Sequence, residues 1–260
     1  MKKNVSIAIT AALVMNGGIV NAQEATNIGK HNITLSKDVM TPETLWAMGR
    51  IGSAQASPDG NKIVYQVGYY SVKENRGHQV ICVMDSDGQN VRQLTTSAKS
   101  EGSPVWLDNH TIAFLLDGQI WSMNSDGTNR KKLSSSDIEI EGFRFSPDGK
   151  KVLLIKSIPY YGTIKKNPSD LPKASGRLIT DMNYRHWDHY VETIAHPFVA
   201  EVTANGISKN DVDIIEGEPY ESPLAPFGGI EQFDWSKDSK QIAYTCRKKE
   251  GVNYAISTDS

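Results

Sequence analysis

One short unit recurs along the chain and constrains its fold more than any other feature. It is clearest at 145–154, where Ser-Pro-Asp-Gly is followed by the aliphatic run Val152-Leu153-Leu154. Proline presets φ for a tight turn and glycine accepts a positive φ, while β-branched and aliphatic residues favour a strand. The unit therefore predicts a tight turn that leads into a buried strand.

The same unit begins at three further places, Ala56, Trp106 and Trp235. The equivalent strand positions are Ile63, Ile112, Val152 and Ile242. They are separated by 49, 40 and 90 residues. A period of about 40–50 residues is typical of a four-stranded blade in a β-propeller. The last interval is about twice as long as the others, so it predicts an insertion or a degenerate blade.

A second repeat, formed by residues 80–95 and 119–134, lies inside the first. In both segments an alternating strand runs into Ser-Asp-Gly and a second strand follows, which is the pattern of a β-hairpin. Turn, inner strand and hairpin together make one blade. We therefore predict an all-β chain, a partial β-propeller of about three and a half four-stranded blades. We also expect a truncated chain, because residues 253–260 end before the fourth strand of the last blade.

The first residues predict export. Two lysines precede an apolar segment, Val5–Met15, and small residues lead up to Gln23. This is the pattern of a secretory signal peptide, and the apolar run is too short to span a bilayer, which argues against a membrane anchor. We expect a signal peptide over 1–22, a flexible leader over 23–40, and a periplasmic or secreted protein with no membrane anchor after cleavage.

A short helix is predicted next. Thr41 is a candidate N-cap, and Pro42 suits the first helical position. Glu43 lies in the first turn, and Gly49 is expected to terminate the helix. The predicted helix directly precedes the first blade in the sequence. Residues 41–260 are then expected to form the incomplete propeller, with an insertion at about 156–226.

Composition excludes some partners. The chain is 38% hydrophobic and 22% charged with a formal net charge of −2, so it has no basic excess for a nucleic-acid partner. Cys82 and Cys246 lie in predicted strands of blades that are not neighbours in sequence. We expect two buried free thiols there rather than a disulfide. No cofactor is expected.

Two segments carry a resemblance to a known family. They are MTPETLWAMGRIGSAQASPDGNKIVYQV at 40–67 and YRHWDHYVE at 184–192. With the repeated Ser-Pro-Asp-Gly units they resemble the N-terminal half of a bacterial prolyl oligopeptidase family enzyme. Within that family the chain is most similar to the dipeptidyl peptidase V and acylaminoacyl peptidase branch, from about residue 38 onward. Ser-Pro-Asp-Gly alone is shared by the Tol-Pal propeller and many others, whereas the other two motifs are more specific.

The resemblance implies a propeller that covers a C-terminal α/β-hydrolase domain, whose Ser-Asp-His triad cleaves peptides after their first residues. The nucleophile of such a domain sits on a Gly-x-Ser-x-Gly elbow, and this motif occurs nowhere in the sequence. Ser53 and Ser103 follow glycines but lack the second one. No catalytic residue is therefore predicted, and the expected partners are a peptide substrate and an α/β-hydrolase domain missing from this chain.

The long interval contains the candidate substrate-binding residues. These are Arg185, His186, Trp187, Asp188 and Glu192. The resemblance implies that propeller groups facing the hydrolase domain help to anchor the free N-terminus of the substrate. A carboxylate suits this role, because it accepts charge-assisted hydrogen bonds from an ammonium group. Asp188 is the first candidate and Glu192 the second.

A structural network is the other interpretation of this cluster. In it, Trp187 fills space between blades while Asp188 pairs with Arg185 or caps a turn. The frequency with which aromatic residues serve packing favours this second interpretation. The histidines of the region are His186, His189 and His196, and their spacing matches no helix-borne metal motif such as His-Glu-x-x-His. We therefore predict no metal site.

Two classes of function remain. The first is the noncatalytic part of an exported serine exopeptidase, which gates and anchors peptides for a hydrolase domain. The alternative is a stand-alone periplasmic propeller that binds a protein or cell-wall partner, like the Tol-Pal propeller. The sequence beyond residue 260 discriminates between them, because only the first requires a Gly-x-Ser-x-Gly elbow there. By itself the chain is expected to hydrolyse nothing.

Overall fold

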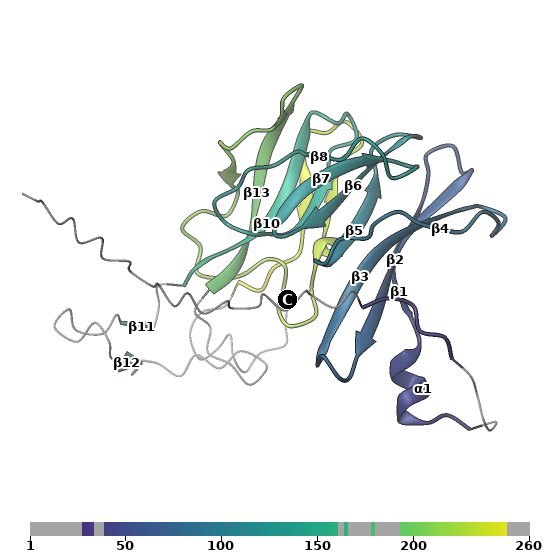
Figure 1. The fold of residues 1–260 in the computed structure, drawn as a ribbon. Coiled ribbons are helices and arrows are strands. Elements are labelled where there is room, and N and C mark those ends of the chain that lie inside the picture. The colour runs from purple at the N-terminus through teal and green to yellow at the C-terminus, as the bar shows by residue number, and fades with distance from the viewer. Residues whose placement is uncertain (1–27, 34–38, 161–163, 166–177, 180–192, 249–260) are drawn as a thin grey trace, which may run out of the picture.

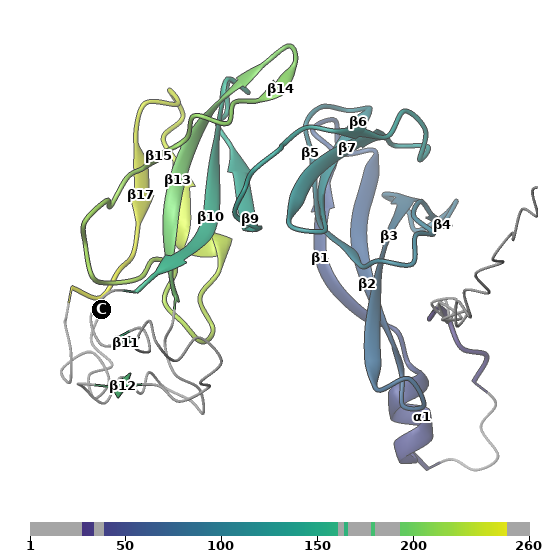
Figure 2. The ribbon, with the colours of Figure 1, turned by 60° about the vertical axis from the view of Figure 1, so that its left-hand side comes forward.

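The computed structural model describes residues 28–33, 39–160, 164–165, 178–179 and 193–248. This part of the chain consists almost entirely of antiparallel strands, and the predicted all-β class is confirmed. Figures 1 and 2 show the sheets following one another from the helix α1 toward the C-terminal strands. Within the described residues, no helix has the length and apolar character needed to cross a bilayer.

The first two sheets are four-stranded meanders, in which strands that are neighbours in sequence are also neighbours in the sheet. The first sheet consists of β1 (Arg50–Ala56), β2 (Lys62–Ser71), β3 (Arg76–Asp85) and β4 (Arg92–Gln93). The second sheet consists of β5 (Glu101–Trp106), β6 (Thr111–Leu116), β7 (Gln119–Asn124) and β8 (Lys131–Lys132). The repeated hairpins predicted at 80–95 and 119–134 are thus confirmed as β3–β4 and β7–β8.

The third sheet has the order β14-β13-β10-β9, and β15 also pairs with β13. Its strands are β9 (Ile140–Phe145), β10 (Lys151–Pro159), β13 (Thr193–Thr203), β14 (Gly206–Ile207) and β15 (Val212–Asp213). Two further pairs are β11 (Ile164–Lys165) with β12 (Leu178–Ile179), and β16 (Phe233–Trp235) with β17 (Ile242–Tyr244), the latter preceded by the 3₁₀-helix Ile230–Gln232.

The Ser-Pro-Asp-Gly turns have the geometry that their sequence predicts. Ser57 Oγ donates to Asp59 Oδ1 at 2.6 Å, and Ser146 Oγ donates to Asp148 Oδ1 at 2.7 Å. These hydroxyl groups are the main reason that the pKa values of both carboxyl groups lie below the usual range. The glycines that follow, Gly60 and Gly149, have φ of +73° and +68°. The turns therefore carry ionised aspartates at neutral pH.

Pairing confirms that the repeat units are equivalent. In the four units, the residue before the turn pairs with the inner-strand residue that the repeat singles out. These pairs are Ala56–Ile63, Trp106–Ile112, Phe145–Val152 and Trp235–Ile242. The four repeats therefore place their strands in the same register, as the sequence predicted.

Three apolar clusters hold successive sheets together. The cluster between the first and second sheets contains Val64, Ile81, Val83, Trp106, Ile112, Phe114 and Met123. The cluster between the second and third sheets contains Ala113, Ile120, Ile140, Phe143, Val152, Leu154, Phe198, Ala200 and Ile207. Leu153, Ile155 and Phe233 join the third sheet to the β16–β17 pair. Successive residues of one strand thus enter different clusters, because side chains alternate between the two faces.

Helix α1 (Pro42–Ala47) confirms the predicted helix, and the Thr41 side chain accepts a hydrogen bond from the Thr44 amide. The prediction that Gly49 terminates the helix is wrong. The capping residue is Met48 in an extended conformation, with φ of −72°. Gly49 instead provides space, because a Cβ atom there would lie 2.8 Å from a ring carbon of Tyr69.

The cysteines follow the prediction in being unpaired: Cys82 is a buried free thiol and Cys246 a partly buried one.

Of the insertion predicted at about 156–226, the described residues include β13, β14 and β15, all of which join the third sheet. The aromatic residues Tyr69 and Trp121 lie in strands and contribute to apolar clusters.

Gly206 is expected to tolerate substitution poorly. Its φ is +122°, and a Cβ atom there would lie 2.5 Å from the carbonyl oxygen of Leu133 in the second sheet. Gly206→Ala should therefore destabilise the chain by about 3 kcal/mol or more, from backbone strain and a rigid clash together. Gly149→Ala is the matched control, since it has a φ of +68° but open space around the added carbon. Urea denaturation midpoints measure both, and equal losses would contradict the clash.

Candidate functional site

The sequence-predicted site residues fall between two paired strand ends. Arg185, His186, Trp187, Asp188 and Glu192 all lie outside the described residues. The strands on either side are described: β10 ends at Pro159, β13 begins at Thr193, and these two residues are cross-strand partners. The chain thus leaves and rejoins the third sheet at one point. Figures 1 and 2 show this point at the same end of the molecule as α1 and the β2–β3 turn. We call it the hairpin end, after the β2–β3 hairpin; the β3–β4 turn lies at the opposite end of β3.

A buried ionic cluster supports the third sheet near this point. Lys156 Nζ donates to both carboxylate oxygens of Asp211, at 2.8 and 2.7 Å. His196, the cross-strand partner of Lys156, places Nδ1 2.8 Å from Asp213 Oδ2. Lys156 Nζ also lies 3.8 Å from the centre of the Phe198 ring. Because the buried Lys156 ammonium group has a carboxylate partner and the His196 ring is hydrogen-bonded to Asp213, the cluster can stay in the interior and fix β15 against β13.

The geometry gives His196 no metal site. Its ring is fully buried, Nδ1 contacts Asp213, and Nε2 has no hydrogen-bond partner. In the part of the chain that the structure describes, no three His, Cys, Asp or Glu side chains are grouped to hold a metal ion. His186 and His189 lie outside it. The sequence did not reveal the ionic cluster, although a lysine in the apolar run of β10 was a signal for a buried partner.

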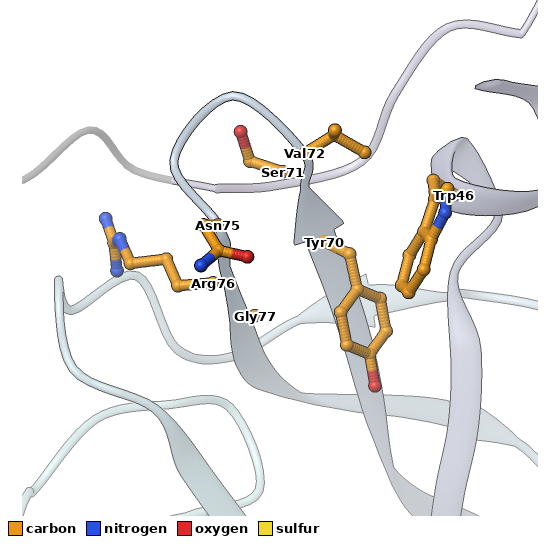
Figure 3. A pocket seen from close by; sticks show the side chains of 7 residues that line it. All are labelled: Trp46, Tyr70, Ser71, Val72, Asn75, Arg76 and Gly77. Atoms are coloured by element: carbon orange, nitrogen blue, oxygen red, sulfur yellow. The ribbon is translucent and has the colours of Figure 1, made fainter.

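A cleft of about 310 Å³ opens at the hairpin end between α1 and the β2–β3 turn. We call it the Trp46 cleft. It is lined by Trp46, Tyr70, Ser71, Val72, Asn75, Arg76 and Gly77 (Figure 3). Figure 3 shows the rings of Trp46 and Tyr70 facing each other from the helix and from β2. Their centroids are 5.7 Å apart in an edge-to-face arrangement.

Arg50 braces these two rings. Its guanidinium carbon lies 5.0 Å from the centre of the Trp46 ring and 4.3 Å from that of Tyr70. Such cation–π contacts stabilise by roughly 0.5–1 kcal/mol each at exposed sites. Among the described residues, no carboxylate forms a salt bridge with Arg50. The face of the Arg50 guanidinium thus contacts both rings and helps to hold the helix in place.

Gly77 makes room for the Tyr70 ring in the wall of the cleft. Tyr70 pairs with Gly77 across β2 and β3, and a Cβ atom on Gly77 would lie only 3.1 Å from the Tyr70 ring. The ring therefore lies over the glycine. The sequence signal for the contact between Arg50 and the rings of the cleft was the four-residue spacing of Trp46 and Arg50. This spacing places one side chain at the end of the helix and the other at the start of β1.

The chemistry of the Trp46 cleft is that of binding. Aromatic rings provide apolar contact, and Arg76 is the arginine in the lining. The Ser71 hydroxyl group, which lines the cleft, accepts a hydrogen bond from the Glu74 amide at 3.2 Å. Among the described residues, no histidine or carboxylate is hydrogen-bonded to Ser71 as a general base would be. We therefore find a surface that can hold part of a ligand and no catalytic constellation.

His78, the neighbour of Gly77 in β3, is buried and its Nε2 atom has no hydrogen-bond partner. Burial lowers the pKa of His78, and the positive charge of Arg76 acts in the same direction. Glu101 opposes the shift of this pKa. Glu101 is itself fully buried and forms a salt bridge with Arg130, whose guanidinium lies 5.1 Å from the centre of the Phe114 ring. The strand that supports the cleft thus holds a neutral histidine in its interior.

Comparison with known proteins gives two informative relatives. The chain is 40% identical over 258 residues to dipeptidyl-peptidase 5 of Porphyromonas gingivalis, which covers 97% of this chain and 36% of that protein. It is 37% identical over 232 residues to dipeptidyl-peptidase 5 of Porphyromonas endodontalis, covering 87% of this chain and 33% of that protein. The chain thus spans about a third of the length of these relatives. No family model matches it.

Among solved structures, acylaminoacyl peptidase of Pyrococcus horikoshii is similar with a TM-score of 0.47 and 12% identity. The alignment covers 66% of this chain and 26% of that one. The relationship to the two dipeptidyl-peptidases is therefore the comparison on which a functional conclusion can rest.

The protein is expected to lose stability at mildly acidic pH through His78. Because its pKa is lowered on folding, the unfolded chain binds a proton first, so stability falls as pH drops below the unfolded value of 6.5. The loss is complete once the pH passes the lowered folded pKa. His78→Gln should shrink the decrease in melting temperature between about pH 7.5 and about pH 5. His110→Gln, at an exposed histidine, is the control, and equal profiles for all three proteins would contradict this assignment.

Proposed function

Because the chain belongs to the prolyl oligopeptidase family of peptidases, we propose that it is the noncatalytic, substrate-selecting part of an exported serine exopeptidase. The observation that carries this proposal is 40% identity over almost the whole chain to a dipeptidyl-peptidase of which it spans 36%. The sequence contains no Gly-x-Ser-x-Gly elbow. We therefore assign hydrolysis to an α/β-hydrolase domain outside these 260 residues.

In this proposal the successive sheets are blades of a β-propeller, with about three and a half blades in this chain. The repeated meander order supports it, as does the common register of the four repeat units. In this role the propeller gates the access of peptides to the hydrolase domain. The predicted signal peptide at 1–22 supports a location of this enzyme in the periplasm or outside the cell.

Substrate anchoring is assigned to the hairpin end. The segment that contains Asp188 and Glu192 begins and ends at the Pro159–Thr193 pair, where the buried ionic cluster stiffens the third sheet. A carboxylate there would accept charge-assisted hydrogen bonds from the substrate's ammonium group. The Trp46 cleft lies at the same end of the molecule and offers aromatic walls for a substrate side chain. Arg185, His186 and Trp187 complete the proposed contact surface.

The mass of the native protein tests the proposal. An antibody against residues 177–202 is expected to detect, in the periplasmic fraction, a species much larger than 28.7 kDa. That species should release dipeptides from a chromogenic substrate in a reaction that serine-directed inhibitors block. Purified residues 23–260 are the control and should hydrolyse nothing. A species at or slightly below 28.7 kDa would favour the stand-alone, partner-binding propeller instead.

The role of Asp188 can be measured in that larger species. Asp188→Asn should raise KM for a dipeptidyl substrate about tenfold or more, because a hydrogen bond to a charged group contributes about 1.5–3 kcal/mol. The matched control is the same peptide with an acetylated N-terminus, which has no ammonium group to lose. If the substitution changes KM equally for both peptides, Asp188 belongs to a structural network and not to the anchor.

A further inference from the structure

One edge of the first sheet is left open beside the Trp46 cleft. In an antiparallel ladder, hydrogen-bonded and non-hydrogen-bonded pairs alternate, and a residue of a non-hydrogen-bonded pair points its N–H and C=O groups away from the partner strand. Ile81 of β3 is such a residue. Its amide donates to Thr95 Oγ1 at 2.9 Å, and its carbonyl oxygen accepts from the Leu94 amide at 2.8 Å. Residues 79 and 77 follow in steps of two, so their main-chain groups point out of the same edge of β3.

The chain itself covers this edge only in part. Strand β4 pairs with β3 at residues 82 and 83, and the Gln79 amide donates to Ser100 Oγ at 3.1 Å. The chain then passes into β5 of the second sheet. Within the part of the chain that the structure describes, no hydrogen bond reaches the amide or the carbonyl oxygen of Gly77, and Gly77 is exposed. One main-chain donor and one acceptor are thus available side by side at the end of the ladder.

The open edge is held in place from both sides. The β2–β3 turn is closed by the Asn75 amide, which donates to the Val72 carbonyl oxygen at 3.2 Å. Gly77 pairs with Tyr70 of β2, and the Tyr70 carbonyl oxygen accepts a hydrogen bond from His31 Nε2 at 2.9 Å on the other side of that strand. A ligand that pairs with Gly77 therefore meets a strand that is already ordered, which lowers the entropic cost of binding.

A strand paired with Gly77 would place one side chain at the Trp46 cleft. Paired residues on neighbouring strands point their side chains to the same face of the sheet. On this face the Tyr70 ring lies over Gly77, and Figure 3 shows the Arg76 side chain directed away from that ring. A glycine within a strand often marks a place where a ligand or another backbone approaches closely. The edge and the cleft, which Gly77 also lines, therefore form one continuous surface.

We propose that the Gly77 edge of β3 binds an extended peptide by strand addition, and that the peptide residue opposite Gly77 places an apolar or aromatic side chain against Trp46 and Tyr70. In antiparallel pairing this residue accepts from the Gly77 amide and donates to the Gly77 carbonyl oxygen. Main-chain hydrogen bonds of this kind give affinity, and the side-chain pocket gives specificity. The choice of a peptide as the ligand rests on the proposed function. The site is a second contact point at the hairpin end, distinct from the anchor around Asp188.

Blocked tripeptides test the edge, because they have no ammonium group for the proposed anchor. Acetyl-Ala-Phe-Ala-amide is titrated into the isotopically labelled full chain, and two-dimensional NMR follows the amide and indole resonances. The Gly77 amide proton should shift downfield in a saturable way, and the Trp46 indole resonance should shift with it. N-methylation of the phenylalanine removes the N–H that donates to Gly77 and should weaken binding about fivefold or more. N-methylation of the first alanine is the matched control, since that N–H points away from β3.

Two substitutions test the donor from the side of the protein. Gly77→Pro removes the N–H, which takes no part in the β2–β3 ladder, and proline is tolerated on an edge strand where the N–H faces outward. Gly77→Ala keeps the N–H and crowds the Tyr70 ring in the same way, because its Cβ atom would also lie about 3.1 Å from a ring carbon. The difference between the two variants therefore isolates the hydrogen bond. Gly77→Pro should bind the tripeptide about fivefold or more weakly than Gly77→Ala.

Three results would overturn the proposal: no saturable shift of the Gly77 amide, equal weakening by the two N-methyl groups, or equal affinity of the two folded variants. A fourth is protection of the Gly77 amide from hydrogen exchange before any peptide is added, since a segment of the chain would then cover the edge. The peptide comparison stays decisive if Gly77→Pro does not fold. Failure here leaves the native mass and dipeptide release unchanged, whereas a native species of 28.7 kDa contradicts the proposed function and not peptide binding at Gly77.

Discussion

Each inner sheet of this chain has two apolar faces, and the rest of the structure depends on burying both of them. In β6, Ile112 packs toward the first sheet while its neighbour Ala113 packs toward the third. A β-strand points successive side chains to opposite faces, so no single partner can cover such a strand. The hydrophobic effect therefore favours sheets stacked in series, each serving as core for the sheets on its two sides. The same requirement explains why Ile28 packs on the outer face of the first sheet.

Apolar burial is not directional, so the relative position of the sheets must come from other contacts. Here two junctions are fixed at the end of the sheets opposite the hairpin end, which we call the turn end. The indole N–H groups of Trp106 and Trp235 donate to the carbonyl oxygens of Gln55 and Arg144 in the preceding sheets. The Asp59 and Asp148 amides donate to side chains of the next turn. The junction between the second and third sheets is fixed by the β13–β14 hairpin, whose Ile207 amide donates to the Leu133 carbonyl oxygen. Gly206 approaches the Leu133 carbonyl so closely that only a residue without Cβ fits. At this junction Phe145 occupies the position that tryptophan occupies at the other two.

Local features of the sequence predicted the strands, the turns and the two hairpins, because Ser-Pro-Asp-Gly and Ser-Asp-Gly impose their geometry within a few residues. Features that depend on distant partners were not predicted. Gly49 was assigned to helix termination, but its role is to make room for Tyr69. Lys156 reaches Asp211 because β15 pairs with β13, a contact between residues far apart in the sequence. The Trp46 cleft likewise needs α1 to dock on β2. The predicted anchor around Asp188 stays a prediction, since it lies outside the described residues.

The two ends of the stacked sheets differ in how much change they tolerate. At the turn end, the Asp59 and Asp148 amides bind the neighbouring turn, and their carboxylates order the turn itself. An insertion there would break bonds both within a turn and between sheets. At the hairpin end, strands can lengthen without such losses: β2 and β3 have 10 residues each, against 6 in β6 and in β7. The extra length of β2 and β3 forms the wall of the Trp46 cleft, and the long connection between β10 and β13 departs from the same end. Binding residues can therefore be added at the hairpin end while the repeated turns keep the sheets in register.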